Sequence, residues 1–137
     1  MSKKPDIVIS SRDAERLETL LESLPAQVLP DMEALREELD RADIVAPEKM
    51  PPSVVTMNST VRFRMASSEK DFRVTLVYPR DVGGGADRIS ILAPVGSALL
   101  GLSVGDEIEW PRPGGGRIRL TIAEILYQPE REGELHR

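Results

Sequence analysis

The sequence predicts an α+β protein, with a short antiparallel helical hairpin in residues 1–50 and a small antiparallel sheet domain in residues 51–137. Two stretches of the first part repeat apolar side chains at spacings of three and four, which is typical of amphipathic helices. Several stretches of the second part alternate apolar and polar side chains, which is typical of half-buried strands. The boundary falls at Pro47, Pro51 and Pro52, because a proline disfavours helix in the residue before it.

The first helix is predicted to begin at Ser10 or Ser11 as N-cap, with Asp13 in its first turn, and to end before Pro25. The preceding apolar residues 7–9 fit a brief edge strand. The predicted buried stripe of the helix consists of Ala14, Leu17, Leu20, Leu21 and Leu24.

The second helix is predicted to begin after Pro30, with Asp31 as its N-cap. Its apolar positions are Met32, Leu35, Leu39 and Ala42. Because residues 25–30 form only a short connection, the two helices should pack antiparallel as a hairpin appended to the sheet domain. Each helix has about 13 residues and is therefore only about 20 Å long.

The second part is predicted to form a sheet of four to six antiparallel strands. Pro94 suits the first turn of a short helix across the concave side of this sheet, and Gly101 is expected to end that helix in a left-handed conformation. A change of apolar phase near Ala123 and Glu124 predicts a bulge in the last strand. The alternating positions place strands near residues 61–65, 72–78, 89–91, 108–110 and 118–127.

Composition excludes several kinds of chemistry. The chain has no cysteine and its only histidine is His136, which excludes disulfides, thiolate chemistry and Ser–His nucleophile pairs. The glycine runs at 83–85 and 114–116 do not match a phosphate-binding loop and are expected to be hairpin turns. No stretch approaches the roughly 20 apolar residues of a membrane span, and no signal peptide is evident, so we expect a cytoplasmic protein without membrane contact.

The net charge of −5 lies in the first part of the chain. Residues 1–50 hold 12 acidic and 7 basic side chains, which leaves 11 of each from the totals of 23 and 18 for residues 51–137. A nucleic-acid clamp would need a basic face, so direct nucleic-acid binding is not expected. The charged residues of the helices are expected to form a solvated outer surface, and residues 130–137 a polar tail.

The most informative segment is residues 89–115, in which a strand, a Pro-initiated helix, a glycine stop, a Gly-Asp turn, a second strand and a Gly-rich hairpin follow one another. Together with Val-Val-Thr-Met-Asn-Ser at 54–59 and the short helical N-terminus, this order resembles the Gre-factor-like family, and within it the Rnk family of regulators of nucleoside diphosphate kinase. The resemblance covers about residues 7–129. It implies an FKBP-like sheet domain and docking on RNA polymerase.

The resemblance also implies a partner-binding segment. In the Gre family the loop and short helix after the Ala-Pro element contact the β′ subunit of RNA polymerase, at the rim of the secondary channel. The residues alone fit both this contact and simple burial in the core, so we expect Leu99 or Leu100 inside and Pro94 at the interface with Val95 and Gly96. The matching positions are Ala93, Pro94, Val95, Gly96, Ser97, Leu99 and Leu100.

The predicted hairpin tip carries Gln27, Asp31 and Glu33. In the Gre factors a much longer coiled coil presents paired acidic residues that help to hold a catalytic magnesium. Asp31 alone fits a helix cap better than a metal site, which needs several oxygen ligands. We therefore expect no catalytic residue, no metal and no cofactor.

Together with the short helices and the single carboxylate near the tip, the resemblance implies a monomeric, non-enzymatic transcription regulator that binds RNA polymerase near the secondary channel and competes with Gre-type factors without transcript cleavage. The alternative is a Gre-like factor that stimulates transcript cleavage through Asp31 and Glu33. A prolyl isomerase that uses Trp110 or Tyr78 is a weaker third alternative, because fold analogy alone does not confer an activity.

Overall fold

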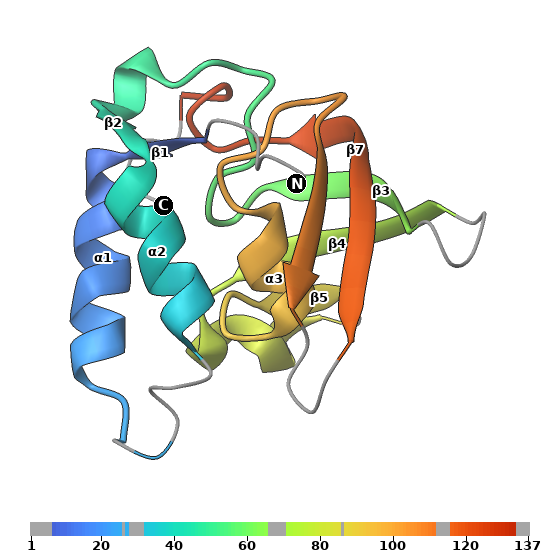
Figure 1. Cartoon of the computed structure of the whole chain (residues 1–137). Coiled ribbons are helices and arrows are strands. Elements are labelled where there is room, and N and C mark those ends of the chain that lie inside the picture. The colour runs from blue at the N-terminus through green and yellow to red at the C-terminus, as the bar shows by residue number, and fades with distance from the viewer. Residues whose placement is uncertain are drawn as a thin grey trace.

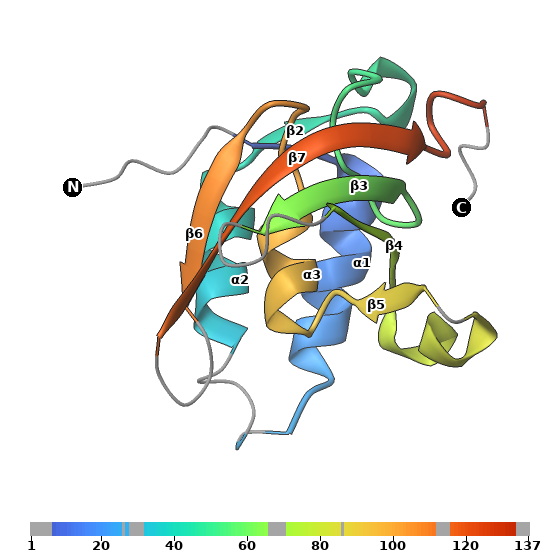
Figure 2. The ribbon, with the colours of Figure 1, turned by 90° about the vertical axis from the view of Figure 1, so that its right-hand side faces the viewer.

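A five-stranded sheet curls over helix α3, and helices α1 and α2 lie on the same side of the sheet (Figures 1 and 2). The structure, a computed structural model, describes residues 7–25, 27, 32–65, 71–85, 87–111 and 116–133. The chain is therefore a mixed α+β protein, as predicted. Within the described residues, no helix combines the length and the apolar character needed to cross a bilayer.

In the N-terminal part of the chain, two helices are flanked in sequence by two short strands. Strand β1 (Val8–Ser10) leads into α1 (Ser11–Glu22), and α2 (Glu33–Arg41) leads into β2 (Asp43–Val45). The two strands pair in parallel, with Ile9 opposite the central residue of β2. The two helices lie side by side (Figure 1). Residues of both helices line one groove.

The ends of the helices agree with the sequence at α1 and differ from it at α2. The Ser10 Oγ accepts a hydrogen bond of 3.1 Å from the Asp13 N–H, which confirms a serine N-cap for α1. Helix α2 begins later than predicted, with Met32 at the N-cap position and no side-chain hydrogen bond there. Asp31, the predicted cap, lies outside the described residues.

The larger sheet is mixed, whereas the sequence predicted an antiparallel one. Its order is β5-β4-β3-β7-β6, and β5 runs parallel to β4 while the other three pairings are antiparallel. The strands are β3 (Thr60–Met65), β4 (Asp71–Val77), β5 (Arg88–Ser90), β6 (Glu107–Pro111) and β7 (Arg117–Tyr127).

The parallel pairing follows from the connection between β4 and β5. Gly83 and Gly84 were expected in a hairpin turn, but they belong to the 3-10 helix η3 (Pro79–Gly84). This helix carries the chain back, so that β5 enters alongside β4 with Leu76 opposite Ile89. The prediction of a hairpin was wrong here because a Pro-initiated 3-10 turn, and not the glycines, decides the path. The second glycine run lies outside the described residues except for Gly116. A further 3-10 helix, η2 (Pro47–Lys49), lies between β2 and β3 in the chain.

The bulge in β7 is confirmed. Arg62 pairs with Glu124 and Phe63 pairs with Ile122, so that Ala123 is passed over in the register. A bulge of this kind shifts the side-chain alternation by one residue. Ile122 and Ile125 can therefore both be buried, although a regular strand would place them on opposite faces.

One hydrophobic core joins the helices to the sheet. Leu17 and Leu35, from α1 and α2, belong to the same buried cluster as Leu76, Leu99 and Ile122. Helix α2 packs against α3. The helical part is therefore packed into the body of the protein, whereas the sequence predicted a hairpin appended to the sheet domain. The apolar stripe of each helix is covered by the common core and not only by the other helix.

Candidate functional site

Helix α3 (Pro94–Leu99) is the centre of the predicted partner-binding segment. Ala93 takes the extended N-cap conformation, and Pro94 lies in the first turn, where its fixed φ suits a helix. The Ser97 N–H donates to the Ala93 carbonyl at 2.9 Å, and the Ser97 Oγ donates to the Ile91 carbonyl at 2.5 Å. Backbone and side chain together therefore hold α3 rigidly on the segment before it.

Gly96 allows this close approach. A Cβ at position 96 would lie 2.1 Å from the Ser90 carbonyl oxygen and 3.2 Å from the Leu76 Cδ1. The backbone of α3 thus rests directly on the end of β5, and only a glycine fits there.

Burial divides the predicted segment into two groups. Ala93 and Val95 are half-buried and keep accessible side-chain surface. Leu99 and Leu100 are both buried, whereas only one of them was expected inside. Gly96 faces β5, although it was expected at the interface. The partner-binding role of the segment stays a prediction. The buried members are Gly96, Ser97, Leu99 and Leu100.

Gly101 anchors the N-terminal strand where α3 ends. Its φ of +82° confirms the predicted glycine stop, and a Cβ there would lie 2.7 Å from the Cβ of Ile7. The Gly101 carbonyl accepts from the Val8 N–H at 3.3 Å, and the Gly101 N–H donates to the Val55 carbonyl at 2.9 Å. The candidate segment and the helical part are therefore fixed to each other at this glycine.

The predicted hairpin tip is described only in part. Gln27 is exposed, and Glu33 is exposed in the first turn of α2, while Asp31 lies outside the described residues. Within the described part of the chain, no group of three or more His, Cys, Asp or Glu side chains is arranged to hold a metal ion.

Asp13 is a buried polar residue whose importance the sequence did not reveal. It lies in the first turn of α1 and is only 2% exposed. Its Oδ2 accepts a hydrogen bond of 3.1 Å from the N–H of Met57, a residue 44 positions later in the chain. An acid in a first helical turn is usually explained by the helix dipole, so no sequence signal marked this one as a tie between the two parts.

The environment of Asp13 favours its protonated form. Burial, and next to it the negative charge of Glu130, raise the pKa of the Asp13 carboxyl from 3.8 to about 7, although the Met57 N–H and Arg16 oppose this. Burial and the charge of Asp13 in turn raise the pKa of the nearby Tyr78 hydroxyl above its ordinary value. These groups form one coupled cluster between α1 and the sheet.

The loop that carries Met57 is itself held by side chains. Asn58 has a φ of +68°, in the left-handed region, which an asparagine tolerates in a turn. The Thr56 N–H donates to the Ser59 Oγ at 2.9 Å, and the Thr56 Oγ1 donates to the Glu130 Oε1 at 2.8 Å. The carboxylate of Asp13 thus meets a loop that is already fixed.

The C-terminal turn clamps the connection between the two parts. Gln128 is fully buried, and its Nε2 donates to the carbonyl oxygens of Pro51 and Val54, at 2.9 and 2.7 Å. Glu130 accepts from the loop described above. The prediction of a simple polar tail from residue 130 onward is therefore wrong for Glu130, which takes part in the fold.

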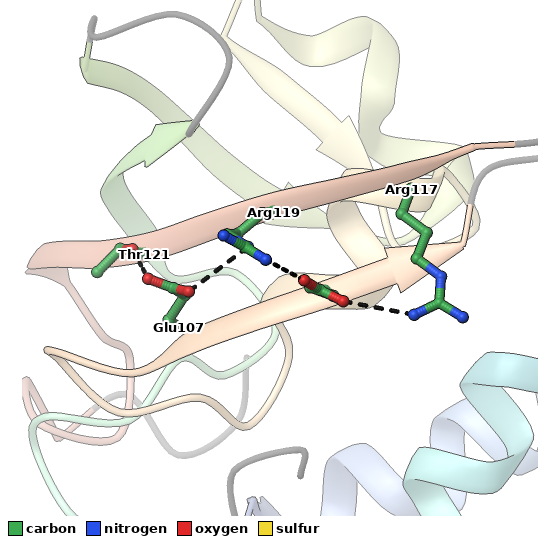
Figure 3. Close-up of polar contacts among 5 residues, drawn as sticks. Glu107, Arg117, Arg119 and Thr121 are labelled. Carbon is green, nitrogen blue, oxygen red and sulfur yellow. Dashed lines mark hydrogen bonds and ion pairs between the residues drawn. The ribbon is translucent and has the colours of Figure 1, made fainter. Parts of the chain in front are cut away.

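The outer face of β6 and β7 carries a ladder of ion pairs (Figure 3). Glu109 accepts hydrogen bonds from Arg119 and, at 3.4 Å, from Arg117. Glu107 lies 3.6 Å from Arg119 and accepts from the Thr121 Oγ1 at 3.5 Å. The hydrogen bond from Arg119 holds the pKa of Glu109 below its ordinary value.

This ladder should contribute little to stability, because Glu107 and both arginines are exposed and Glu109 is only half-buried. We expect Arg119→Gln to lower the urea midpoint only slightly, and the difference to vanish in about 1 M salt, where such pairs are screened. Urea unfolding at low and high salt measures this. A large loss that persists in high salt would show that Arg119 stabilises the sheet by packing instead.

Comparison with known proteins agrees with this geometry. Residues 50–127 match the family described as "Transcription elongation factor, GreA/GreB, C-term", and residues 5–45 match the one described as "Rnk N-terminus". The chain therefore belongs to the GreA/GreB-like family of transcription factors, in the branch that carries the Rnk N-terminus. This confirms the resemblance found in the sequence.

Within that branch, the chain is 48% identical to the "Regulator of nucleoside diphosphate kinase" of Escherichia coli (strain K12) over 131 residues, which is 96% of each chain. A solved structure, "Prokaryotic transcription elongation factor GreA/GreB from Nitrosomonas europaea", is 62% identical and has a TM-score of 0.70, covering 90% of this chain and 100% of that one. "Transcription elongation factor GreA" of Methylobacterium sp. (strain 4-46) is 29% identical over 133 residues, 91% of this chain and 84% of its own.

Proposed function

We propose that this protein is a non-enzymatic transcription regulator that binds RNA polymerase near the secondary channel and competes there with Gre-type factors. Its membership of the GreA/GreB-like family supports the general function. In this proposal residues 1–50 form the short helical hairpin that approaches the channel. Residues 51–137 form an FKBP-like domain that supplies the affinity, and the protein acts as a monomer.

The partner surface in this proposal is the exposed side of α3. Val95 and Ala93 keep accessible apolar surface on a helix that is held rigidly by Ser97 and Gly96. A rigid apolar contact loses little conformational entropy when it binds. We propose that this surface contacts the coiled-coil rim of the β′ subunit.

We propose that the protein does not stimulate transcript cleavage, because of the length and packing of helices α1 and α2. Helix α1 has 12 residues and α2 has 9, which correspond to lengths of about 18 and 14 Å. Both helices also bury their apolar stripes in the common core, with Leu17, Leu21 and Leu35 fully covered. Such helices have little length to extend into a channel and would lose this core if they detached.

Two assays test the proposal directly. The full chain should co-migrate with core RNA polymerase and be displaced by a Gre factor. It should not stimulate cleavage in arrested elongation complexes. Stimulation that Asp31→Ala and Glu33→Ala abolish would instead establish the cleavage-factor alternative. Failure to bind core polymerase would refute the proposal as a whole.

Val95→Glu tests the surface itself. We expect it to weaken polymerase binding at least about tenfold, because a charge would be buried against an apolar contact. Leu126→Glu is the matched control, since Leu126 is an exposed leucine on β7, 39% accessible, away from α3. Equal affinity of both variants in a competition assay would remove α3 as the contact, provided that circular dichroism shows both folded.

A further inference from the structure

Strand β4 has an edge that β5 covers only in part. β5 pairs with β4 over residues 75–77, whereas β4 begins at Asp71. Within the described residues, no further strand pairs with residues 71–74 on this side. Figure 1 shows the first half of β4 projecting past β5. We call residues 71–74 the free edge of β4.

The hydrogen bonds of β4 show which residues of the free edge point outward. The Thr75 N–H donates to the Asp87 carbonyl at 2.7 Å, on the β5 side of β4. Because this direction alternates along an antiparallel strand, the backbone groups of Asp71 and Arg73 point to the same side. β5 does not reach these two residues, so each presents an N–H and a C=O to which a further strand could pair.

The side chains of the free edge differ between the two faces of the sheet. Phe72 points to the core face, where its ring stacks on Phe63 with 5.6 Å between the centroids, yet it remains 38% exposed. Asp71 and Arg73 alternate with Phe72 and therefore lie on the outer face. The free edge thus presents an acid, an aromatic ring and a base in succession.

The charge of Arg73 is only weakly balanced within the chain. Arg73 lies directly opposite Arg62 of β3, and like charges in such a position are unfavourable. Its ion pair with Asp87 is long, 3.8 Å, and both side chains are about two-thirds exposed, at 64% and 65%. An exposed pair of this kind contributes little. A second carboxylate beside Arg73 would therefore be favourable.

A second copy of the chain, placed antiparallel along the free edge, supplies that carboxylate. The outward-pointing residues can face each other in three registers, because Asp71 and Arg73 must meet Asp71 or Arg73 of the other copy. Two of these registers bring like charges together, either the two acids or the two arginines, and are unfavourable. The third brings Asp71 of each copy opposite Arg73 of the other, and Phe72 opposite Phe72. Charge therefore selects one register, in which two ion pairs and an aromatic contact form together.

We propose that two copies of this protein pair through the free edge of β4, antiparallel and with Phe72 of one copy opposite Phe72 of the other. Asp71 and Arg73 then exchange backbone hydrogen bonds across the two-fold axis. The contact involves far fewer than the about 20 residues on each side of a stable interface, so the pair forms at high concentration and dissociates on dilution. The monomer proposed above remains the form that binds polymerase, and the pairing does not depend on that function.

Sedimentation equilibrium and NMR spectra of the isotope-labelled full chain, between about 20 μM and about 2 mM, measure the pairing. We expect the average mass to rise toward twice that of the monomer, and the amide signals of residues 71–73 to shift with concentration. Arg73→Asp and Asp71→Arg should each weaken the pairing at least about tenfold, because like charges then face each other. An equimolar mixture of these two variants should pair again, since every acid then faces a base.

Arg80→Asp is the matched control, because Arg80 is an exposed arginine in η3 whose ion pair, with Asp81, is equally long at 3.8 Å. It changes the net charge as Arg73→Asp does and should pair like the wild type. Arg73→Asp also places an acid opposite Arg62, so its fold should be retained, which circular dichroism checks.

Four results would overturn the proposal. The wild type could remain monomeric at about 2 mM, or the concentration-dependent shifts could lie outside the free edge. Arg80→Asp and Arg73→Asp could weaken the pairing equally, which would indicate a general effect of net charge. Finally, the mixture of the two folded free-edge variants could stay monomeric, which would exclude the register.

Discussion

Gly96→Ala is expected to destabilise the protein by at least about 3 kcal/mol, or to prevent its folding. The new Cβ would lie 2.1 Å from the Ser90 carbonyl oxygen, and this atom belongs to the backbone at the end of β5. It cannot move aside as a flexible side chain would, so α3 must shift away from the sheet. Chemical unfolding monitored by circular dichroism measures the loss.

Gly83→Ala is the matched control, because a Cβ at position 83 in η3 would meet no atom within 4 Å. Its stability should stay within about 0.5 kcal/mol of the wild type. Similar stability of both variants would refute the close packing of α3 on β5. The stability measurement also helps to interpret the polymerase assays. If Gly96→Ala lost polymerase binding, the cause would be the altered fold of the segment and not a lost direct contact.

Asp13→Asn should stabilise the protein at about pH 8 and leave its stability nearly unchanged at about pH 4. In the fold the pKa of Asp13 is raised from 3.8 to about 7. Between these values the native state holds a proton that the unfolded state has lost, so the stability contributed by this group falls as the pH rises. The full difference is on the order of 4 kcal/mol. The asparagine keeps an oxygen for the Met57 N–H and removes the ionisation.

Urea unfolding at several pH values between about 4 and 8 measures this effect. Glu130, Arg16 and Tyr78 face Asp13, and their own substitutions would change the profile, so the comparison leaves them intact. Glu18→Gln is the control, because it removes one exposed carboxylate from the same helix and should run parallel to the wild type. Parallel profiles for Asp13→Asn and the wild type would show that Asp13 is ionised throughout.

Local signals predicted most of the elements. Ser10 caps α1, Pro94 opens α3, Gly101 takes its left-handed conformation, and the phase change at Ala123 marks a bulge. Each of these depends on the conformational preference of one residue or on a short periodic pattern, which a sequence displays directly. The predictions were wrong where a structural feature depends on residues that are distant in the sequence. The direction of β5 depends on how η3 carries the chain, and no alternation of side chains contains that information.

The candidate site divides in the same way. The segment from Ala93 to Leu100 was identified by its resemblance to the Gre-family element, but the burial of Gly96 and of both leucines depends on β5 and the core. Asp13 resembled an ordinary first-turn acid. Only the approach of Met57, 44 residues later, shows that it ties two parts of the chain together.

By itself, the sequence determined the α+β class, the short helices, the family and the lack of cysteine chemistry, because composition, periodicity and motif order are properties of the chain alone. The tertiary structure decided that the helices share the core of the sheet, that Gln128 and Glu130 clamp the connection, and that Asp13 retains its proton to about pH 7. Burial and the field of neighbouring charges set these properties, and both exist only when distant residues meet.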